Sequence, residues 1–131
     1  MPEKEYIAYK GLEFQIEWYY SPKGESQALD YYLKLAADDR QNVLKLFRMM
    51  GEIGAIRDKT KFRFEGDKVY AFKPQPHRFL SFFVEGRKII VTNAFWKKQQ
   101  KLPPGEKDRA LRCMNSYKTR VKEGTYYEKE K

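Results

Sequence analysis

The sequence has few of the residues on which disulfide-rich, metal-binding or membrane proteins depend. Its 131 residues include one cysteine, Cys113, and one histidine, His77. A single cysteine excludes an internal disulfide framework and a thiolate zinc cage, and a single histidine excludes multi-histidine metal sites. Apolar runs such as Ile89–Val91 are far shorter than the roughly 20 residues of a transmembrane helix. Residues 1–5 are mostly charged and no apolar stretch of signal-peptide length follows, so we expect a cytoplasmic protein with no membrane partner.

The composition is that of one globular domain. Hydrophobic residues make up 41% of the chain and charged residues 34%, which is too apolar for a disordered protein and too charged for a membrane protein. No internal repeat, Gly/Ser linker or low-complexity tract precedes the last few residues. We therefore predict a single domain over residues 1–124 and a disordered C-terminal tail over residues 125–131.

The net charge of +9 is unevenly distributed along the chain. Residues 1–55 carry seven Lys and Arg against nine Asp and Glu, a net of −2, whereas residues 56–131 carry twenty against nine, a net of +11. A small domain with its positive excess in one half is expected to have a basic face that binds a polyanion or an acidic protein. The alternative is a solvated surface that only keeps the protein soluble.

The first half of the chain predicts one strand followed by two helices. Apolar and polar residues alternate over residues 12–20, which is typical of a half-buried strand. Apolar residues recur at helical spacing over residues 25–36, and again after a cap at Asp38 or Asp39 until Gly54. The apolar stripe of the second helix consists of Val43, Leu46, Phe47, Met50 and Ile53. We expect the two helices to form a hairpin packed on one face of a sheet.

The second half predicts strands and a final helix. After the alternating residues 61–64 and a turn, strands are expected over residues 69–73, 78–84 and 88–93. A last helix is expected to begin near Pro104, where the missing N–H is harmless. The predicted order is β-α-α-β-β-β-α, an α+β fold with a small antiparallel sheet whose helices lie mainly on one face.

Familiar catalytic signatures are absent from the sequence. It has no glycine-rich phosphate loop, no H-E-x-x-H and no G-x-S-x-G. Carboxylates are sparse in the basic half, so two-metal phosphoryl chemistry would have few ligands there, and we predict neither a metal nor a cofactor.

Lysine, arginine and aromatic residues gather instead at two places. Residues 93–101 contain Asn93, Phe95, Trp96, Lys97, Lys98 and Lys101, and residues 70–79 contain Tyr70, Lys73, His77 and Arg78. Aromatic rings can stack on unpaired bases, and the cations can neutralise phosphates, so both segments are candidates for binding nucleic acid. The alternatives are that the Lys97–Lys98 pair is a solvated turn and that Phe95 belongs to the core.

The segment Lys88–Ala110 resembles the C-terminal signature of HigB-like toxins, in the phage-derived Gp49-like group of the RelE/ParE toxin–antitoxin superfamily. The shared pattern is a hydrophobic strand, a small or polar pair, Phe, an x-Lys-Lys step, a polar stretch, Lys-x-Pro and an acidic residue before an Ala-containing helix. Residues 69–73 and 78–80 resemble two further strands of that family. The resemblance covers roughly residues 56–121 by motif and the whole chain by element order.

The resemblance implies a RelE-like fold and the toxin component of a type II toxin–antitoxin system. It implies a ribosome-dependent, metal-independent mRNA endoribonuclease, or mRNA interferase, that inhibits translation. The partners would be mRNA on the ribosome and a cognate helix-turn-helix antitoxin, with no small-molecule cofactor. Two other readings stay open: a ParE-like toxin that binds DNA gyrase, and a non-catalytic phage or regulatory protein of the same fold.

The resemblance also assigns roles to particular residues. Arg78 matches the strand arginine of the family and would hold the scissile phosphate, while Lys73 would contact phosphate where the family commonly has arginine. Lys97 and Lys98 match the Lys-Lys step and would stabilise the transition state or protonate the leaving oxygen. The candidate RNA contacts are Tyr70, His77, Asn93, Phe95, Trp96 and Lys101.

Two of these assignments have structural alternatives. Arg78 could form a surface ion pair with Glu85 or Asp67, and His77 could be a solvated loop histidine.

Overall fold

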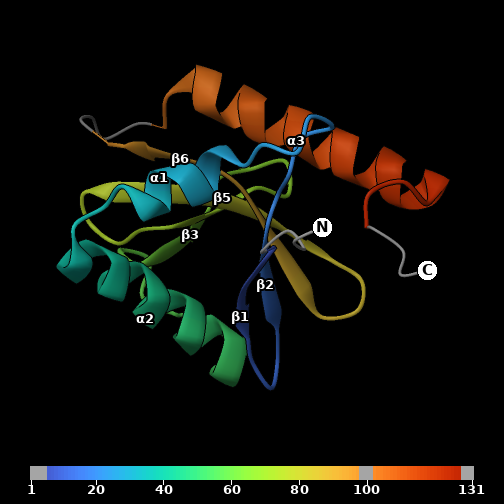
Figure 1. Ribbon diagram of the computed structural model, residues 1–131. Helices are drawn as coiled ribbons and strands as arrows, with labels where there is room; N and C mark the ends of the chain where they lie inside the picture. The colour runs from blue at the N-terminus through green and yellow to red at the C-terminus, as the bar shows by residue number, and fades with distance from the viewer. Residues whose placement is uncertain (1–5, 98–101, 128–131) are drawn as a thin grey trace.

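A computed structural model describes residues 6–97 and 102–127. They form an α+β fold with a six-stranded sheet and three helices (Figure 1). In chain order the elements are β1 (Ile7–Lys10), β2 (Gln15–Trp18), α1 (Gln27–Leu33), α2 (Ala37–Ile53), β3 (Phe62–Phe64), β4 (Tyr70–Phe72), β5 (His77–Val84), β6 (Lys88–Trp96) and α3 (Pro104–Glu123). The predicted order β-α-α-β-β-β-α is therefore wrong in the number of strands, because it omits β1 and β3.

The sheet is mixed, with the strand order β1-β2-β6-β5-β4-β3. Strand β2 runs parallel to β6, with Gln15 opposite Lys88 and Trp18 opposite Val91, whereas the other neighbours are antiparallel. The prediction of an antiparallel sheet is therefore wrong for this pair. Residue alternation reports which face a side chain occupies, and it carries no information about the direction of the neighbouring strand.

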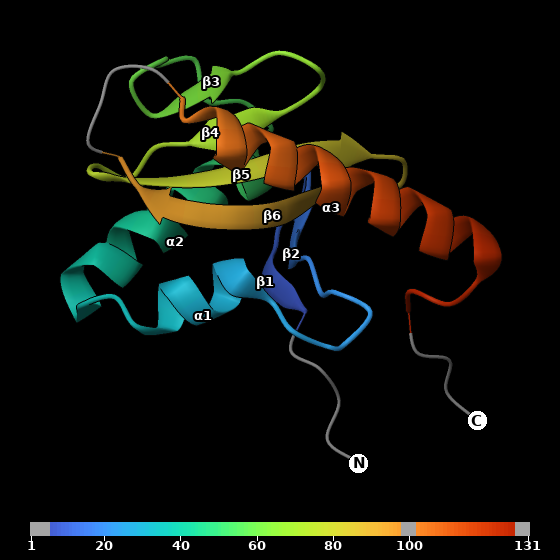
Figure 2. The same ribbon diagram turned by 90° about the horizontal axis from the view of Figure 1, so that it is seen from above.

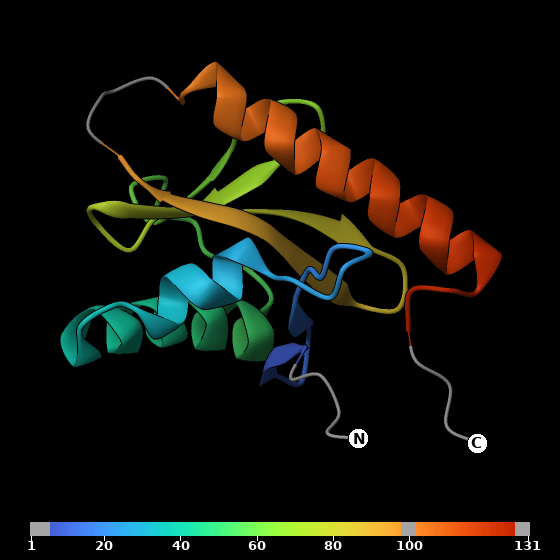
Figure 3. The same cartoon turned by 45° about the horizontal axis from the view of Figure 1, so that its top comes forward.

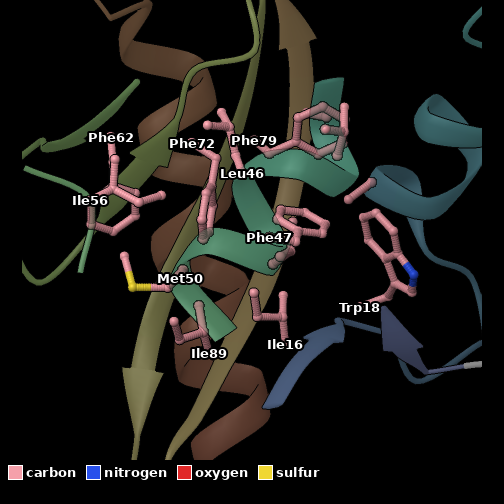
Figure 4. Close-up of a cluster of buried hydrophobic side chains, with 14 residues drawn as sticks. Ile16, Trp18, Leu46, Phe47, Met50, Ile56, Phe62, Phe72, Phe79 and Ile89 are labelled. Carbon is pink, nitrogen blue, oxygen red and sulfur yellow. The ribbon is translucent and has the colours of Figure 1, made fainter. Parts of the chain in front are cut away.

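The helices cover both faces of the sheet, so the prediction that they lie mainly on one face is also wrong. Helices α1 and α2 lie under one face and α3 crosses the other (Figures 1 and 3). Between α2 and the sheet, the ring of Phe47 packs edge-on against Phe72 and Trp18 (Figure 4). Together, the aromatic rings buried in such a cluster supply a large part of the hydrophobic stabilisation of the fold.

The ends of the helices follow local signals in the sequence. The Ser26 hydroxyl caps α1 by accepting from the backbone N–H of Leu29. Helix α2 starts earlier than predicted, with Ala36 at the cap position and Asp38 and Asp39 in the first turn, where carboxylates favour the helix dipole. It ends at Gly54, whose φ of 86° is accessible to glycine without strain.

A second core lies beneath α3. Ala110, Met114 and Tyr117, spaced along one face of α3, belong to the same buried cluster as Leu80 of β5 and Ile90 of β6. Figure 2 shows α3 crossing the sheet obliquely above β5 and β6. The predicted start near Pro104 is confirmed.

The residues after Gly124 close this second core, although the sequence placed them in a disordered tail. Tyr126 is buried, and its hydroxyl accepts a hydrogen bond from the backbone N–H of Tyr20 at 2.9 Å. The hydroxyl of Tyr127 donates to the buried carboxylate of Glu17 at 2.7 Å. The tail prediction is therefore wrong for Tyr126 and Tyr127, and residues 128–131 lie outside the described residues.

None of the helices in the described part of the chain combines the length and hydropathy that a bilayer-spanning helix requires.

Candidate functional site

The strand register gathers four cationic residues at one end of the sheet. Phe72 pairs with Phe79, so Lys73 and Arg78 are the next residues on adjacent strands. Arg78 in turn pairs with Phe95, and the N–H of Lys97 donates to the carbonyl of Pro76 at 3.0 Å. Four adjacent strands thus bring one cationic residue each to this end of the sheet, either within the strand (Arg63 and Arg78) or directly after it (Lys73 and Lys97).

These four residues, here named the cationic cluster, occupy the α3 face of the sheet. Ala71, Leu80 and Phe95 belong to the core beneath α3. Side chains two apart on a strand share a face, as do cross-strand partners. Lys73, Arg78 and Lys97 therefore face the same side as that core, and Arg63 does so through its pairing with Ala71.

Arg78 is the buried centre of the cationic cluster, with 7% of its surface exposed. Its Nη1 donates to the side-chain oxygen of Gln75 at 3.2 Å and to the backbone oxygen of His77 at 2.9 Å. Its Nε is buried and has no hydrogen-bond partner among the described residues. An unpaired buried donor is unfavourable, so an anionic oxygen that reached it would relieve the deficit.

The positive charges in the cationic cluster repel one another. Burial lowers the pKa of Lys73, and the nearby positive charges of Arg78 and Lys97 lower it further. Burial and the charge of Arg78 likewise lower the pKa of Lys97. The carboxylate of Glu65 partly offsets these effects on both lysines. Both ammonium groups therefore lose their protons at a lower pH than an ordinary surface lysine does.

Arg63 and Glu65 were missed in the sequence analysis. The alternation of Phe62 and Phe64 did place Arg63 on the opposite face from the two rings. However, the sequence does not show that β3 lies beside β4, and only that pairing brings Arg63 and Glu65 to the cationic cluster.

Three predicted RNA contacts face away from the cationic cluster. His77 begins β5 and is 8% exposed; its Nδ1 lies 2.7 Å from the Tyr31 hydroxyl and its Nε2 lies 3.5 Å from Asp39. The alternative of a solvated loop histidine is therefore wrong. Trp96 pairs with His77 across the strands and is exposed, while Tyr70 is half-buried on the same face of the sheet.

Asn93 and Phe95 hold the structure around the cationic cluster. The Asn93 side chain is fully buried, and its Nδ2 donates to the backbone and carboxylate oxygens of Glu106 at 3.1 and 3.0 Å. This contact fixes the first turn of α3 against β6. Phe95 is buried beneath α3, which agrees with the alternative that Phe95 belongs to the core. Lys98 and Lys101 lie outside the described residues.

The expected ion pairs of Arg78 do not form within the described part of the chain. Asp67 binds Lys107 instead, with Nζ and Oδ2 2.8 Å apart. The described residues also contain no group of three or more His, Cys, Asp or Glu side chains placed to hold a metal ion.

Comparison with known proteins identifies the family. The sequence model of the phage-derived protein Gp49-like family (DUF891) matches residues 30–115, which is more than half of the chain. The matched region runs from α1 into α3 and contains every member of the cationic cluster. No curated protein matches the chain. The chain therefore belongs to the phage-derived Gp49-like family, which is part of the RelE/ParE-like toxin superfamily.

Proposed function

We propose that this protein is the toxin of a type II toxin–antitoxin system and a HigB-type mRNA interferase that cuts mRNA on the ribosome without a metal ion. The observation that carries the proposal is the cationic cluster, in which the buried Nε of Arg78 has no hydrogen-bond partner in the part of the chain that the structure describes. A phosphodiester group supplies the negatively charged acceptor oxygens that such a donor lacks.

The proposed reaction uses the nucleophile that RNA itself provides. The 2′-oxygen attacks the adjacent phosphorus, the bond from phosphorus to the 5′-oxygen breaks, and a cyclic phosphate and a free 5′-hydroxyl remain. The 2′-hydroxyl must lose a proton and the departing 5′-oxygen must gain one. Catalysis therefore needs in-line positioning, charge neutralisation and two proton transfers.

The cationic cluster can supply these needs. Arg78 would hold the scissile phosphate, since its guanidinium offers several donors in a fixed plane. The lowered pKa of Lys73 makes its ammonium easier to deprotonate, so that its amine could accept the 2′-proton, and the lowered pKa of Lys97 makes its ammonium a better acid for the 5′-oxygen. Lys98, by resemblance, would add positive charge. The ribosome would orient the mRNA, so few further acid–base groups are needed.

We also propose that a helix-turn-helix antitoxin binds this protein and blocks the cationic cluster. The resemblance to toxin–antitoxin proteins supports this partner, and the net charge of +9 suits an acidic inhibitor surface. A small helix-turn-helix gene next to this one would support the pairing.

The test is inducible expression followed by mapping of RNA 5′ ends. The wild type should arrest growth and create new 5′ ends inside translated regions. The double variant Arg78→Ala, Lys97→Ala should do neither. A matched control, Lys45→Ala with Arg48→Ala, removes two exposed cations from α2 and should cleave like the wild type.

The alternatives give different results in the same experiment. Growth arrest with intact mRNA and accumulating DNA breaks would refute the ribonuclease proposal and favour a ParE-like gyrase poison. Growth without arrest would favour a non-catalytic member of the family, for which Lys73 in place of the usual arginine is the motivating feature.

A further inference from the structure

An exposed aromatic ring stands at the open edge of the sheet, outside the cationic cluster. Phe64 ends β3, the edge strand, and 55% of its surface is exposed. Among the described residues, Phe64 and Trp96 are the exposed aromatic side chains. The exposed ring on this short edge strand is accessible to a flat ligand that could stack on it.

The ring of Phe64 is the outer end of a row of aromatic side chains. It lies 5.0 Å from the ring of Tyr70, measured between centroids. Tyr70 stacks nearly parallel on Phe62 at 5.5 Å and meets Phe83 edge-on at 5.1 Å. The contact with Tyr70 supports the Phe64 ring on one side, which reduces the side-chain freedom that Phe64 would lose when a flat ligand stacks on it.

Cationic residues lie close to Phe64 in the sequence. Lys61 and Lys68, three residues before it and four residues after it, are exposed, and Arg63 lies on the face of the cationic cluster. Strand β3 thus presents positive charge on one face and an aromatic platform on the other. Figure 2 shows β3 at the margin of the sheet, and in the strand order no further strand follows it, so both faces of the sheet meet at this edge.

We infer that Phe64, backed by Tyr70, forms a stacking subsite for an unpaired nucleobase of the RNA whose phosphate lies at the cationic cluster. The inference rests on the proposed function and adds a contact to a base, which the cationic cluster itself does not provide. Single-stranded RNA combines a polyanionic backbone with flat apolar bases, and this edge offers a complement to both. An apolar protein segment could contact the Phe64 ring but would gain no electrostatic attraction from Lys61 and Lys68.

The test measures binding of a short single-stranded oligoribonucleotide that carries 2′-O-methyl groups, which block the attacking oxygen. Fluorescence anisotropy at low salt gives the Kd. Phe64→Ala should weaken binding about 5- to 20-fold, since one base stack is lost. Phe64→Tyr keeps a ring and should restore binding to near the wild-type value. The control Ile53→Ala truncates an exposed apolar residue on α2 and should leave Kd unchanged.

An abasic version of the same oligonucleotide separates stacking from charge. The wild type should bind it more weakly, and Phe64→Ala should then bind it as well as the wild type does. Equal loss for Phe64→Ala on both oligonucleotides would overturn the subsite, because the substitution would then act through the fold. Equal binding of the normal oligonucleotide by Phe64→Ala and the wild type would overturn it too.

The proposed function is judged separately. If the wild type binds no RNA even at low salt, the subsite is overturned, whereas the ribonuclease proposal still depends on the cellular cleavage experiment. If cellular cleavage is absent but the base-dependent loss at Phe64 is observed, the subsite stands as a property of an RNA-binding protein.

Discussion

Replacing Arg78 with methionine should remove RNA cleavage without weakening the fold. Arg78 is buried, yet within residues 6–97 and 102–127 it forms no ion pair with a carboxylate and its Nε has no hydrogen-bond partner. Methionine has a similar length and fills irregular space in a core. We therefore expect Arg78→Met to abolish activity while the protein stays folded.

The magnitude follows from the contacts of the guanidinium. Its two Nη1 hydrogen bonds contribute about 1.5–3 kcal/mol each, as bonds of a charged group. Against them stand the desolvation of the charge, which costs several kcal/mol, and about 1–3 kcal/mol for the unpaired Nε. These contributions roughly cancel, and the apolar side chain adds favourable burial. We expect the free energy of unfolding either to fall by less than about 1 kcal/mol or to rise by up to about 2 kcal/mol.

Urea denaturation followed by tryptophan fluorescence gives this free energy, since Trp18 is buried in the core and reports its exposure. The same variant should show raised lysine pKa values by NMR titration, because the charge of Arg78 lowers the pKa of both Lys73 and Lys97. A loss of more than about 2 kcal/mol would refute the reasoning. It would mean that Arg78 holds the sheet together and that its burial is structural.

Three further properties can be measured. The pKa values of Lys73 and Lys97 are lowered, so both should lose their positive charge, and RNA affinity should fall, as the pH rises toward the usual lysine pKa of 10.5. An unchanged Kd over this pH range would contradict the electrostatic explanation. Burial raises the pKa of the Cys113 thiol to about 11, so a disulfide reagent at about pH 8 should label the native protein far more slowly than the unfolded one. Tyr127→Phe leaves the buried Glu17 carboxylate without one donor and should lower the free energy of unfolding by about 1–3 kcal/mol, as urea titration would show.

Local features of the fold were predictable because short-range chemistry sets them. The alternation at Phe62 and Phe64 marks β3, and Gly54 ends α2 because glycine adopts a positive φ freely. Pro104 begins α3 because its missing N–H would have no helical partner at that position. Each of these depends on a few neighbouring residues.

Features that depend on distant pairings could not be predicted. Strand β1, Ile7–Lys10, has no clean alternation and exists because it lies beside β2. The parallel pairing of β2 with β6 and the crossing of α3 on the opposite face are likewise set by the whole chain.

The candidate site divides in the same way. Arg78 and Lys73 were predicted in one segment and Lys97 in another, all three as residues that act on phosphate, and the register brings them together. The sequence could not show that His77 points toward Tyr31 on the other face, since one residue along a strand reverses the face. Arg63 was missed because its place at the site depends on β3 lying beside β4.

The parallel pair in the sheet also sets the order in which the protein can mature. Strand β2 is made early, but its partner β6 follows only after both helices and three strands have been synthesised. Pairings between such distant segments close large loops and form late in folding. The nascent chain consequently holds its acidic N-terminal half and nine of the twenty cations of its basic half before Lys97, the residue after β6, completes the cationic cluster. The cationic cluster therefore cannot assemble until β6 has been synthesised and has paired with β5.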